Sequence, residues 1–168
     1  MEALIARLRE RFPTAIQEVI TFRGETTVVV PREALVEVCT YLRDEEGFNV
    51  LADLCAVDYL PRTPRFAVNY HLLSLDHRRR LRVKVFVEEE DPVVPTVTGV
   101  WPGANWHERE AFDLMRIRFE GHPDPRRILL PAEWEGHPLR KELPVVVEEI
   151  AYSFNKARIY AEKPFARE

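Results

Sequence analysis

Cysteine is scarce in this chain of 168 residues. Only Cys39 and Cys55 are present, and neither belongs to a CxxC pair. Two isolated thiols cannot build a disulfide framework, and a cysteine-ligated iron–sulfur cluster usually needs four thiolates. The chain alone is therefore not expected to hold such a cluster. Cys39 falls on the apolar stripe of an expected helix and Cys55 inside an expected strand, so both are predicted to be small core residues.

Glycine is scarce, and an excess of positive charge and long apolar runs are missing. None of the six glycines lies in a GxGxxG or P-loop pattern, which argues against phosphate or dinucleotide binding. The net charge of −4 argues against a nucleic-acid partner. No apolar run approaches the roughly 18–20 residues of a membrane span, and the acid-containing N-terminus is not a secretion signal. We therefore expect a cytoplasmic chain without a direct membrane span.

The sequence does contain a globular composition, with 46% hydrophobic and 31% charged residues, and clear periodic segments. The order helix, hairpin, helix and further antiparallel strands predicts an α+β fold. Its sheet is expected to be antiparallel or mixed, with helices packed on one face. The predicted elements are a helix at 4–12, a hairpin of 19–22 and 26–30, a helix between Pro31 and Gly47, and strands at 49–57, 66–75 and 81–87.

The composition changes after residue 91, where prolines become frequent and regular periodicity largely gives way. We therefore divide the chain into an α+β scaffold domain at 1–91, a Pro-rich, irregular docking segment at 92–144 and an extended C-terminal tail at 145–168. A helix at 105–115 is the exception within the irregular part.

The charged residues of the 105–115 helix have local explanations. Asn105 is a plausible N-cap with Glu108 three residues later, as in a capping box. Arg109 and Asp113 have the spacing of an ordinary i,i+4 ion pair. The carboxylates Glu108, Glu110 and Asp113 could also do acid–base chemistry, but the structural interpretation is favoured.

The tetrapeptide Glu-Gly-His-Pro occurs twice, at 120–123 and 135–138, and each copy precedes a basic pair. Gly and Pro favour rigid, extended turns at both copies. The pairs, Arg126 with Arg127 and Arg140 with Lys141, are expected to meet carboxylates across a protein interface, together with Trp134. These features predict a non-catalytic subunit with a stiff docking segment.

The histidines leave an alternative open. A small metalloenzyme could use His122, His137 and nearby carboxylates, but the tight HExxH spacing of such sites is absent. No Gly-x-Ser-x-Gly motif indicates a nucleophile either. A histidine beside glycine and proline more often caps a turn by hydrogen bonding, and this is the interpretation favoured here.

Residues 106–144 read WHEREAFDLMRIRFEGHPDPRRILLPAEWEGHPLRKELP. They closely resemble the signature of the thirty-kilodalton subunit (the C subunit) of respiratory complex I, NADH:quinone oxidoreductase. Segments further upstream extend the resemblance to nearly the whole chain from residue 50. The chain departs from the signature at Arg116, where glycine is usual, and at Glu142-Leu143, where Asp with an aromatic is usual. The matching positions are Glu108, Arg109, Glu110, Asp113, Phe119, Gly121, His122, Pro123, Arg127, Trp134, Gly136, Pro138, Leu139, Arg140 and Lys141.

The resemblance implies a chain without a cofactor, metal or catalytic residue of its own. Such subunits sit in the hydrophilic arm on the cytoplasmic side of the cell membrane, as peripheral proteins. Their partners are the large quinone-site subunit of 49 kDa (the D subunit) and neighbouring Fe-S subunits, while FMN, Fe-S clusters and quinone are bound by partner subunits. Membrane-bound hydrogenases and related oxidoreductases contain equivalent subunits. The expected partner-binding residues are Arg109, Glu110, Asp113, His122, Arg126, Arg127, Trp134, His137, Arg140 and Lys141.

Overall fold

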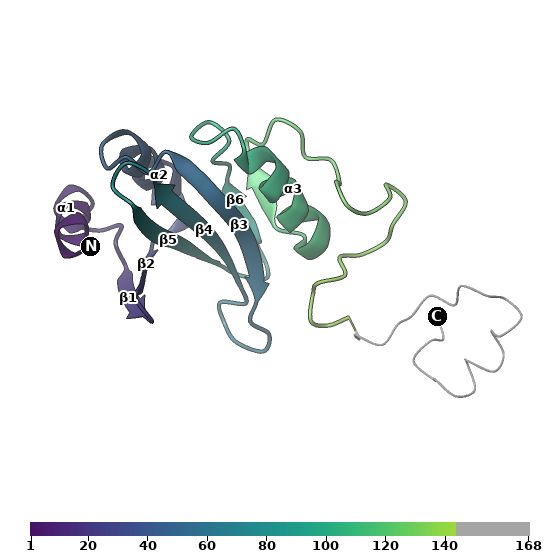
Figure 1. Cartoon of the computed structure of the whole chain (residues 1–168). Helices are drawn as coiled ribbons and strands as arrows, with labels where there is room; N and C mark the ends of the chain where they lie inside the picture. The colour runs from purple at the N-terminus through teal and green to yellow at the C-terminus, as the bar shows by residue number, and fades with distance from the viewer. Residues whose placement is uncertain (144–168) are drawn as a thin grey trace, which may run out of the picture.

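The computed structural model describes residues 1–143, so the expected C-terminal tail lies outside the described residues. These residues form an α+β fold in which a five-stranded sheet packs against helices (Figure 1). The elements are α1 (Glu2–Arg11), β1 (Glu18–Phe22), β2 (Glu25–Val29), the 3-10 turn η1 (Arg32–Ala34), α2 (Leu35–Asp44), β3 (Val50–Asp58), β4 (Phe66–Ser74), β5 (Arg79–Val87), β6 (Val93–Pro95), α3 (Ala104–Met115) and β7 (Arg118–Glu120).

The main sheet is mixed, as predicted, with the strand order β1-β2-β5-β4-β3. Only the β2–β5 pair in this sheet is parallel, and it sets Val28 opposite Val83. The other neighbours are antiparallel. The predicted hairpin turn is confirmed at Arg23 and Gly24, whose φ angles of 50° and 80° lie in the left-handed region.

The hydrophobic core lies between one face of this sheet and the helices. In β4 the alternate residues Phe66, Val68, Tyr70 and Leu72 are buried and belong to one cluster with side chains of α1, α2 and α3. In Figure 1 α3 lies beside β3, at the edge of the sheet away from β1. Cys39 of α2 is buried as predicted, but the prediction that Cys55 is a core residue is wrong. Cys55 follows the buried Leu54 in β3, so it points to the opposite face of the sheet and is only half-buried.

Two short strands after residue 91 were not predicted. β6 and β7 pair in parallel, with Val94 opposite Phe119, and both of these side chains are buried. Strands of three residues are too short to show a period of two. The expected domain boundary at residue 91 stays a prediction, although residues beyond it contribute to the same core.

The predicted capping box of α3 is wrong. The helix begins at Ala104, after Gly103, without a side-chain cap. Glu108 instead points into the protein, where its carboxylate accepts hydrogen bonds from the Val97 N–H at 2.8 Å and the Thr96 hydroxyl at 2.5 Å. α3 ends at Met115, and the next residue, Arg116, has a left-handed backbone (φ 64°) that the usual glycine of the signature would adopt without strain.

Within the part of the chain that is described, no helix has both the length and the apolar character needed to cross a bilayer.

Candidate docking site: α3 and the segment that follows it

A buried carboxylate on α3 holds the first part of the following segment. Asp113 Oδ2 accepts hydrogen bonds from the N–H groups of Ile128, Leu129 and Leu130, at 3.1, 2.8 and 2.9 Å. Its Oδ1 lies 2.7 Å from Nη1 of Arg127. Burial alone would raise the pKa of Asp113, but these backbone donors and the Arg127 guanidinium outweigh it and lower the pKa. Asp113 is therefore an ionised anchor for the segment.

The predicted ion pair between Arg109 and Asp113 is wrong, because Arg127 takes that carboxylate. Arg109 instead donates hydrogen bonds to the carbonyl oxygens of Arg126 and Arg127, both at 2.9 Å. Its guanidinium also lies 5.4 Å from the centre of the Trp106 ring. Arg109 and Asp113 thus bind the same stretch of backbone from two points on α3.

His122, in the first Glu-Gly-His-Pro copy, forms a turn as predicted. Its Nδ1 accepts a hydrogen bond from the Asp124 N–H at 3.0 Å, and its Nε2 lies 3.2 Å from the Asn105 carbonyl oxygen. A carbonyl can only accept, so Nε2 carries the proton. Because both ring nitrogens are occupied by backbone groups, His122 has no free lone pair for a metal ion. Gly121 enters this turn with a φ of 79°.

His137, in the second copy, connects the segment to the end of α3. Its Nδ1 lies 2.8 Å from the Asp113 carbonyl oxygen, to which it must donate, and its ring contacts Phe112 edge-on at 6.0 Å between centroids. Burial lowers the pKa of His137, so the neutral ring is favoured. The neighbouring Gly136 carbonyl accepts a hydrogen bond from Arg127. Both copies therefore pack against α3.

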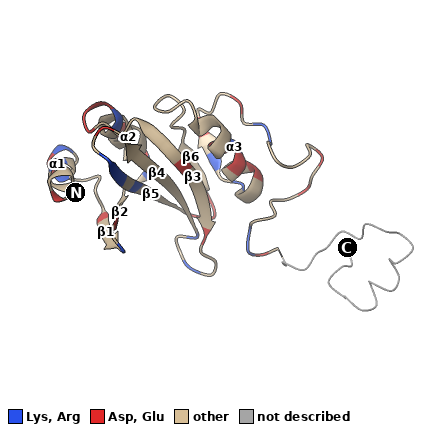
Figure 2. Cartoon of the chain, in the orientation of Figure 1, with Lys and Arg blue, Asp and Glu red and all other residues tan. Residues whose placement is uncertain are grey.

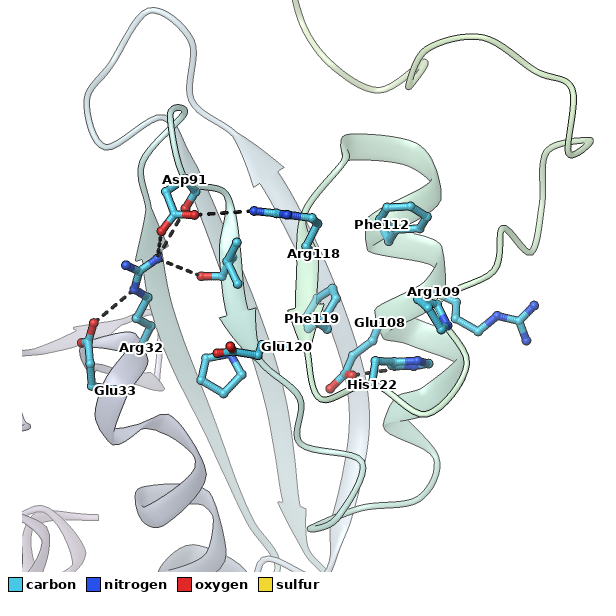
Figure 3. Close-up of a pocket in the computed structure, with 13 residues that line it drawn as sticks. Arg32, Glu33, Asp91, Glu108, Arg109, Phe112, Arg118, Phe119, Glu120 and His122 are labelled. Carbon is cyan, nitrogen blue, oxygen red and sulfur yellow. Dashed lines mark hydrogen bonds and ion pairs between the residues drawn. The ribbon is translucent and has the colours of Figure 1, made fainter.

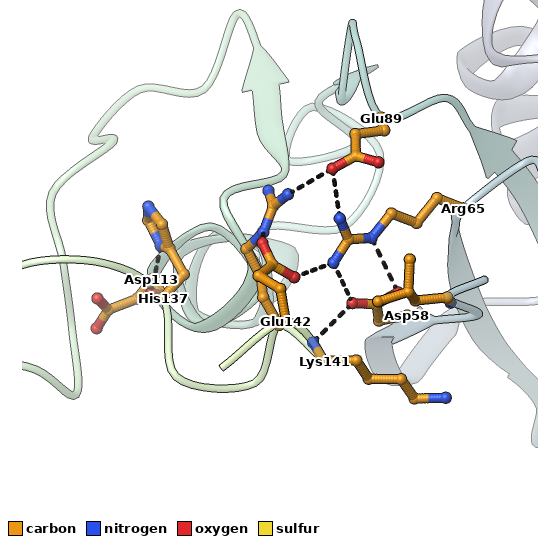
Figure 4. A network of polar contacts seen from close by, with 9 residues as sticks. Asp58, Arg65, Glu89, Asp113, His137, Lys141 and Glu142 are labelled. Carbon is orange, nitrogen blue, oxygen red and sulfur yellow. Dashed lines mark hydrogen bonds and ion pairs between the residues drawn. The ribbon is translucent and has the colours of Figure 1, made fainter. Parts of the chain in front are cut away.

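The end of the segment is held by an ion-pair network that sequence reasoning missed (Figure 4). Arg65 meets Asp58 through two hydrogen bonds, of 3.1 and 2.8 Å, and both side chains are almost fully buried. Arg65 also contacts Glu89 and Glu142. Burial would raise the pKa of Asp58, but Arg65 and the Lys141 and Leu60 N–H groups hold it well below its usual range. The network joins the sheet to the segment 83 residues away in sequence from Asp58.

The expected partner-binding residues thus divide into two groups. Glu110, Arg126, Trp134 and Lys141 are exposed, although Arg126 also pairs with Asp124. The others are held by contacts within the chain, and these are Arg109, Asp113, His122, Arg127, His137 and Arg140.

Large apolar side chains remain exposed on α3 and on the segment. Trp106 is 61% exposed and Leu129 is 60% exposed. Exposed apolar side chains on an ordered segment are typical of the residues that anchor protein interfaces. We call this set the apolar display: Trp106, Leu129, Trp134, Leu139 and Leu143.

A cavity of about 730 Å³ lies between η1, the β6–β7 pair and α3 (Figure 3). Phe112, Phe119 and His122 line it, and Arg32 and Asp91 form an ion pair at 2.7 Å on its η1 side. Glu108 is buried at its wall. Burial raises the pKa of Glu108 to about 7, against smaller opposing effects of the Thr96 and Val97 hydrogen bonds.

Glu108 should therefore reduce stability as the pH rises. Its folded pKa of about 7 exceeds the reference value of 4.5, so the folded state binds the extra proton and loses stability between these values. Glu108→Gln keeps an oxygen for the Val97 N–H and an amide donor for Thr96. Because glutamine does not ionise, we expect this variant to keep the stability that the unsubstituted protein loses when Glu108 ionises. That loss amounts to about 3 kcal/mol or less at pH 8.

Thermal or urea unfolding of both proteins from pH 4 to pH 8 measures this difference. Glu110→Gln is the matched control, because Glu110 lies on the same helix but is exposed. Parallel pH profiles for Glu108→Gln and the unsubstituted protein would contradict the expectation.

Residues 28–149 match the family model described as "Respiratory-chain NADH dehydrogenase, 30 Kd subunit". Proteins named as the C subunit of NADH-quinone oxidoreductase are similar over most of the chain. That of Roseiflexus sp. (strain RS-1) is 54% identical over 167 residues, which are 98% of this chain and 96% of the relative. That of Geotalea uraniireducens (strain Rf4) is 50% identical over 141 residues, or 84% and 86% of the two chains.

Two solved structures share the fold. One, described as "Nqo5 of the trypsin-resistant fragment (1-134) in P63 form", has a TM-score of 0.65 at 41% identity and covers 74% of this chain and 99% of its own. The other belongs to the membrane-bound sulfane sulfur reductase, an archaeal respiratory membrane complex. It has a TM-score of 0.73, covers 97% of this chain and 91% of its own, and at 23% identity shows the fold alone.

Proposed function

Because the chain belongs to the family of the 30 Kd subunit of respiratory-chain NADH dehydrogenase, we propose that it is a non-catalytic subunit of a proton-translocating NADH:quinone oxidoreductase. In this proposal the chain supports assembly of the hydrophilic arm, on the cytoplasmic side of the membrane, as a peripheral protein. FMN, Fe-S clusters and quinone are bound by partner subunits, and electrons pass from NADH to quinone through those centres. The described residues serve to position a docking surface.

The observation that supports this role is the way the 120–143 segment is held. Buried Asp113 and Asp58 fix it at two places, while the apolar display stays exposed. A preordered segment loses less conformational entropy on binding, so more of its contact energy appears as affinity. We propose that the partner of this surface is the large quinone-site subunit, with neighbouring Fe-S subunits beside it.

Affinity isolation from gently solubilised membranes tests the proposal. The tagged full chain should bring down flavin- and cluster-bearing subunits, including the large quinone-site subunit. Recovery of the chain without redox subunits would contradict the proposed function.

The surface itself is tested by Trp134→Ala combined with Lys141→Glu. Lys141 is the better charge reversal within its pair, because Arg140 already contacts Glu89 and Glu142 and its loss would disturb the fold. We expect recovery of partner subunits to fall about tenfold or more, since interface anchors commonly cost more than 1 kcal/mol each.

Phe22→Ala is the matched control, because Phe22 is an exposed aromatic residue like Trp134, at 67% exposure, but lies on β1. It should leave recovery unchanged. Equal losses in both variants would show that the segment is not the principal docking surface.

An equivalent subunit of a related membrane-bound oxidoreductase is the second candidate, and the fold shared with the sulfane sulfur reductase supports it. The same isolation distinguishes the two. NADH-oxidising flavin subunits among the recovered proteins support the first candidate, whereas hydrogenase-type subunits support the second.

A further inference from the structure

The face of the sheet opposite α1 and α2 carries three side chains of metal-ligand type. Asp53 and His71 face each other across β3 and β4, and Cys55 lies two residues beyond Asp53 on the same strand. Residues two apart on a strand point to the same face, and directly opposed residues have neighbouring side chains. The strand register therefore brings a carboxylate, a thiol and an imidazole together.

These side chains converge closely. One ligand atom from each of the three lies within 4.8 Å of the others, and Cys55 Sγ lies 3.9 Å from His71 Nε2. A fourth group comes from α3, because His107 Nδ1 lies 3.6 Å from Asp53 Oδ1. Zinc bonds of about 2.0–2.3 Å in a tetrahedron separate neighbouring ligand atoms by roughly 3.3–3.7 Å. Small side-chain adjustments would bring Asp53, Cys55 and His71 to that geometry, whereas His107 contacts only Asp53 of the three and would have to turn toward the ion.

We propose that Asp53, Cys55, His71 and His107 form a binding site for a zinc ion. One sulfur, two nitrogens and one oxygen make a ligand set that a borderline-soft, tetrahedral divalent cation prefers over calcium or magnesium. Three ligands come from the sheet and one from α3. The ion would therefore connect the edge of the sheet to the helix against which residues 120–143 pack. This site is a departure from the sequence-based expectation of a metal-free chain.

A nearby arginine could in principle neutralise the cluster instead. Lys and Arg residues are frequent in β5 (Figure 2), and Arg82 lies opposite His71 and so on the same face of the sheet. Arg82, however, is held by Glu25 at 2.7 Å and by the Thr27 hydroxyl at 3.3 Å. Glu110 adds negative potential at Cys55 from α3, which Lys84 of β5 partly offsets. Arg82 is therefore engaged elsewhere, and the thiol and the imidazoles of the cluster can bind an added cation.

Metal binding by the full, metal-stripped chain tests the site. Zinc is titrated in competition with a chromophoric chelator, and cobalt is added separately as a spectroscopic substitute. We expect one equivalent of zinc, and a cobalt complex with tetrahedral bands and a thiolate-to-cobalt charge-transfer absorption. Binding of no stoichiometric zinc, or a cobalt spectrum without the thiolate band, would overturn the proposal.

Substitutions then assign the ligands. Cys55→Ser and His71→Gln should each weaken zinc binding by about 100-fold or more, since loss of even an outer-shell partner costs about 10–100-fold. His107→Gln should weaken it by at least about tenfold. His77→Gln, an exposed histidine outside the cluster, should leave affinity unchanged. Unaltered affinity in Cys55→Ser and His71→Gln, with native circular dichroism, would refute the site. These experiments measure zinc affinity, whereas the affinity isolation measures recovery of partner subunits. Failure of one proposal therefore does not imply failure of the other.

Discussion

Replacing Arg65 by methionine is expected to lower the free energy of unfolding by about 3–5 kcal/mol. The reason is the charge that it leaves behind. Asp58 is buried, and without Arg65 the contacts of its carboxylate among residues 1–143 would be the Leu60 and Lys141 N–H groups. These two hydrogen bonds compensate only in part for the lost hydration of a buried charge that has no counter-ion. Urea unfolding at neutral pH, read by fluorescence and circular dichroism, measures the loss.

A double substitution separates the ion pair from simple packing. Arg65→Met combined with Asp58→Asn removes both charges and should recover part of the stability lost in Arg65→Met. Glu89→Gln is the control within the same network, because Glu89 is partly exposed and should cost less than about 1 kcal/mol. If the double variant is no more stable than Arg65→Met, the stranded Asp58 charge is not the cause.

The same pair has an acid-side signature. The folded pKa of Asp58 is depressed, so its contribution is present above the reference value of 3.8 and is lost as the pH falls through the lower folded pKa. Removing Arg65 removes a main cause of the depression. In Arg65→Met the part of the acid-induced loss of stability that comes from Asp58 should therefore be smaller than in the unsubstituted protein.

The main helices and strands could be predicted because each is long enough to show its period. In α2 and β5, for example, buried side chains recur at helical and alternating spacing. β6 and β7 could not be predicted in this way, since each has only three residues and depends on a partner about 25 residues away in sequence. The face of the sheet on which Cys55 lies depends on the strand register, and the sequence of one strand does not reveal that register.

The candidate site was predictable at the level of the segment but not of its contacts. The i,i+4 rule paired Arg109 with Asp113 because it considers one helix alone. In the fold, Arg127 and three backbone N–H groups from the next segment compete for that carboxylate and take it. The link between Asp58 and the end of the segment likewise arises only in the fold, where the Lys141 N–H donates to Asp58. Such contacts depend on the tertiary path of the chain.

Replacing Asp113 by alanine should release the 120–143 segment from α3 while the sheet remains folded. Oδ2 of Asp113 is the acceptor for the N–H groups of Ile128, Leu129 and Leu130. Removal of the carboxylate leaves these donors and the Arg127 guanidinium without their buried partner. Each unsatisfied donor costs about 1–3 kcal/mol unless it reaches water, so the segment should detach to become hydrated.

Hydrogen exchange at these three amides measures the release directly. We expect exchange in Asp113→Ala to be about 100-fold faster or more, which corresponds to a local loss of about 3 kcal/mol. Core amides of β4 should change far less, because that strand lies between β3 and β5.

Arg127→Ala is the matched variant, because it removes the cation but keeps the three backbone hydrogen bonds. Its amides at 128–130 should stay largely protected. Equal acceleration in both variants would mean that the ion pair, rather than the backbone contacts of Asp113, holds the segment. Fast exchange in Asp113→Ala together with reduced recovery of partner subunits would connect this anchor to docking, since an unfixed segment must be ordered again at each binding event.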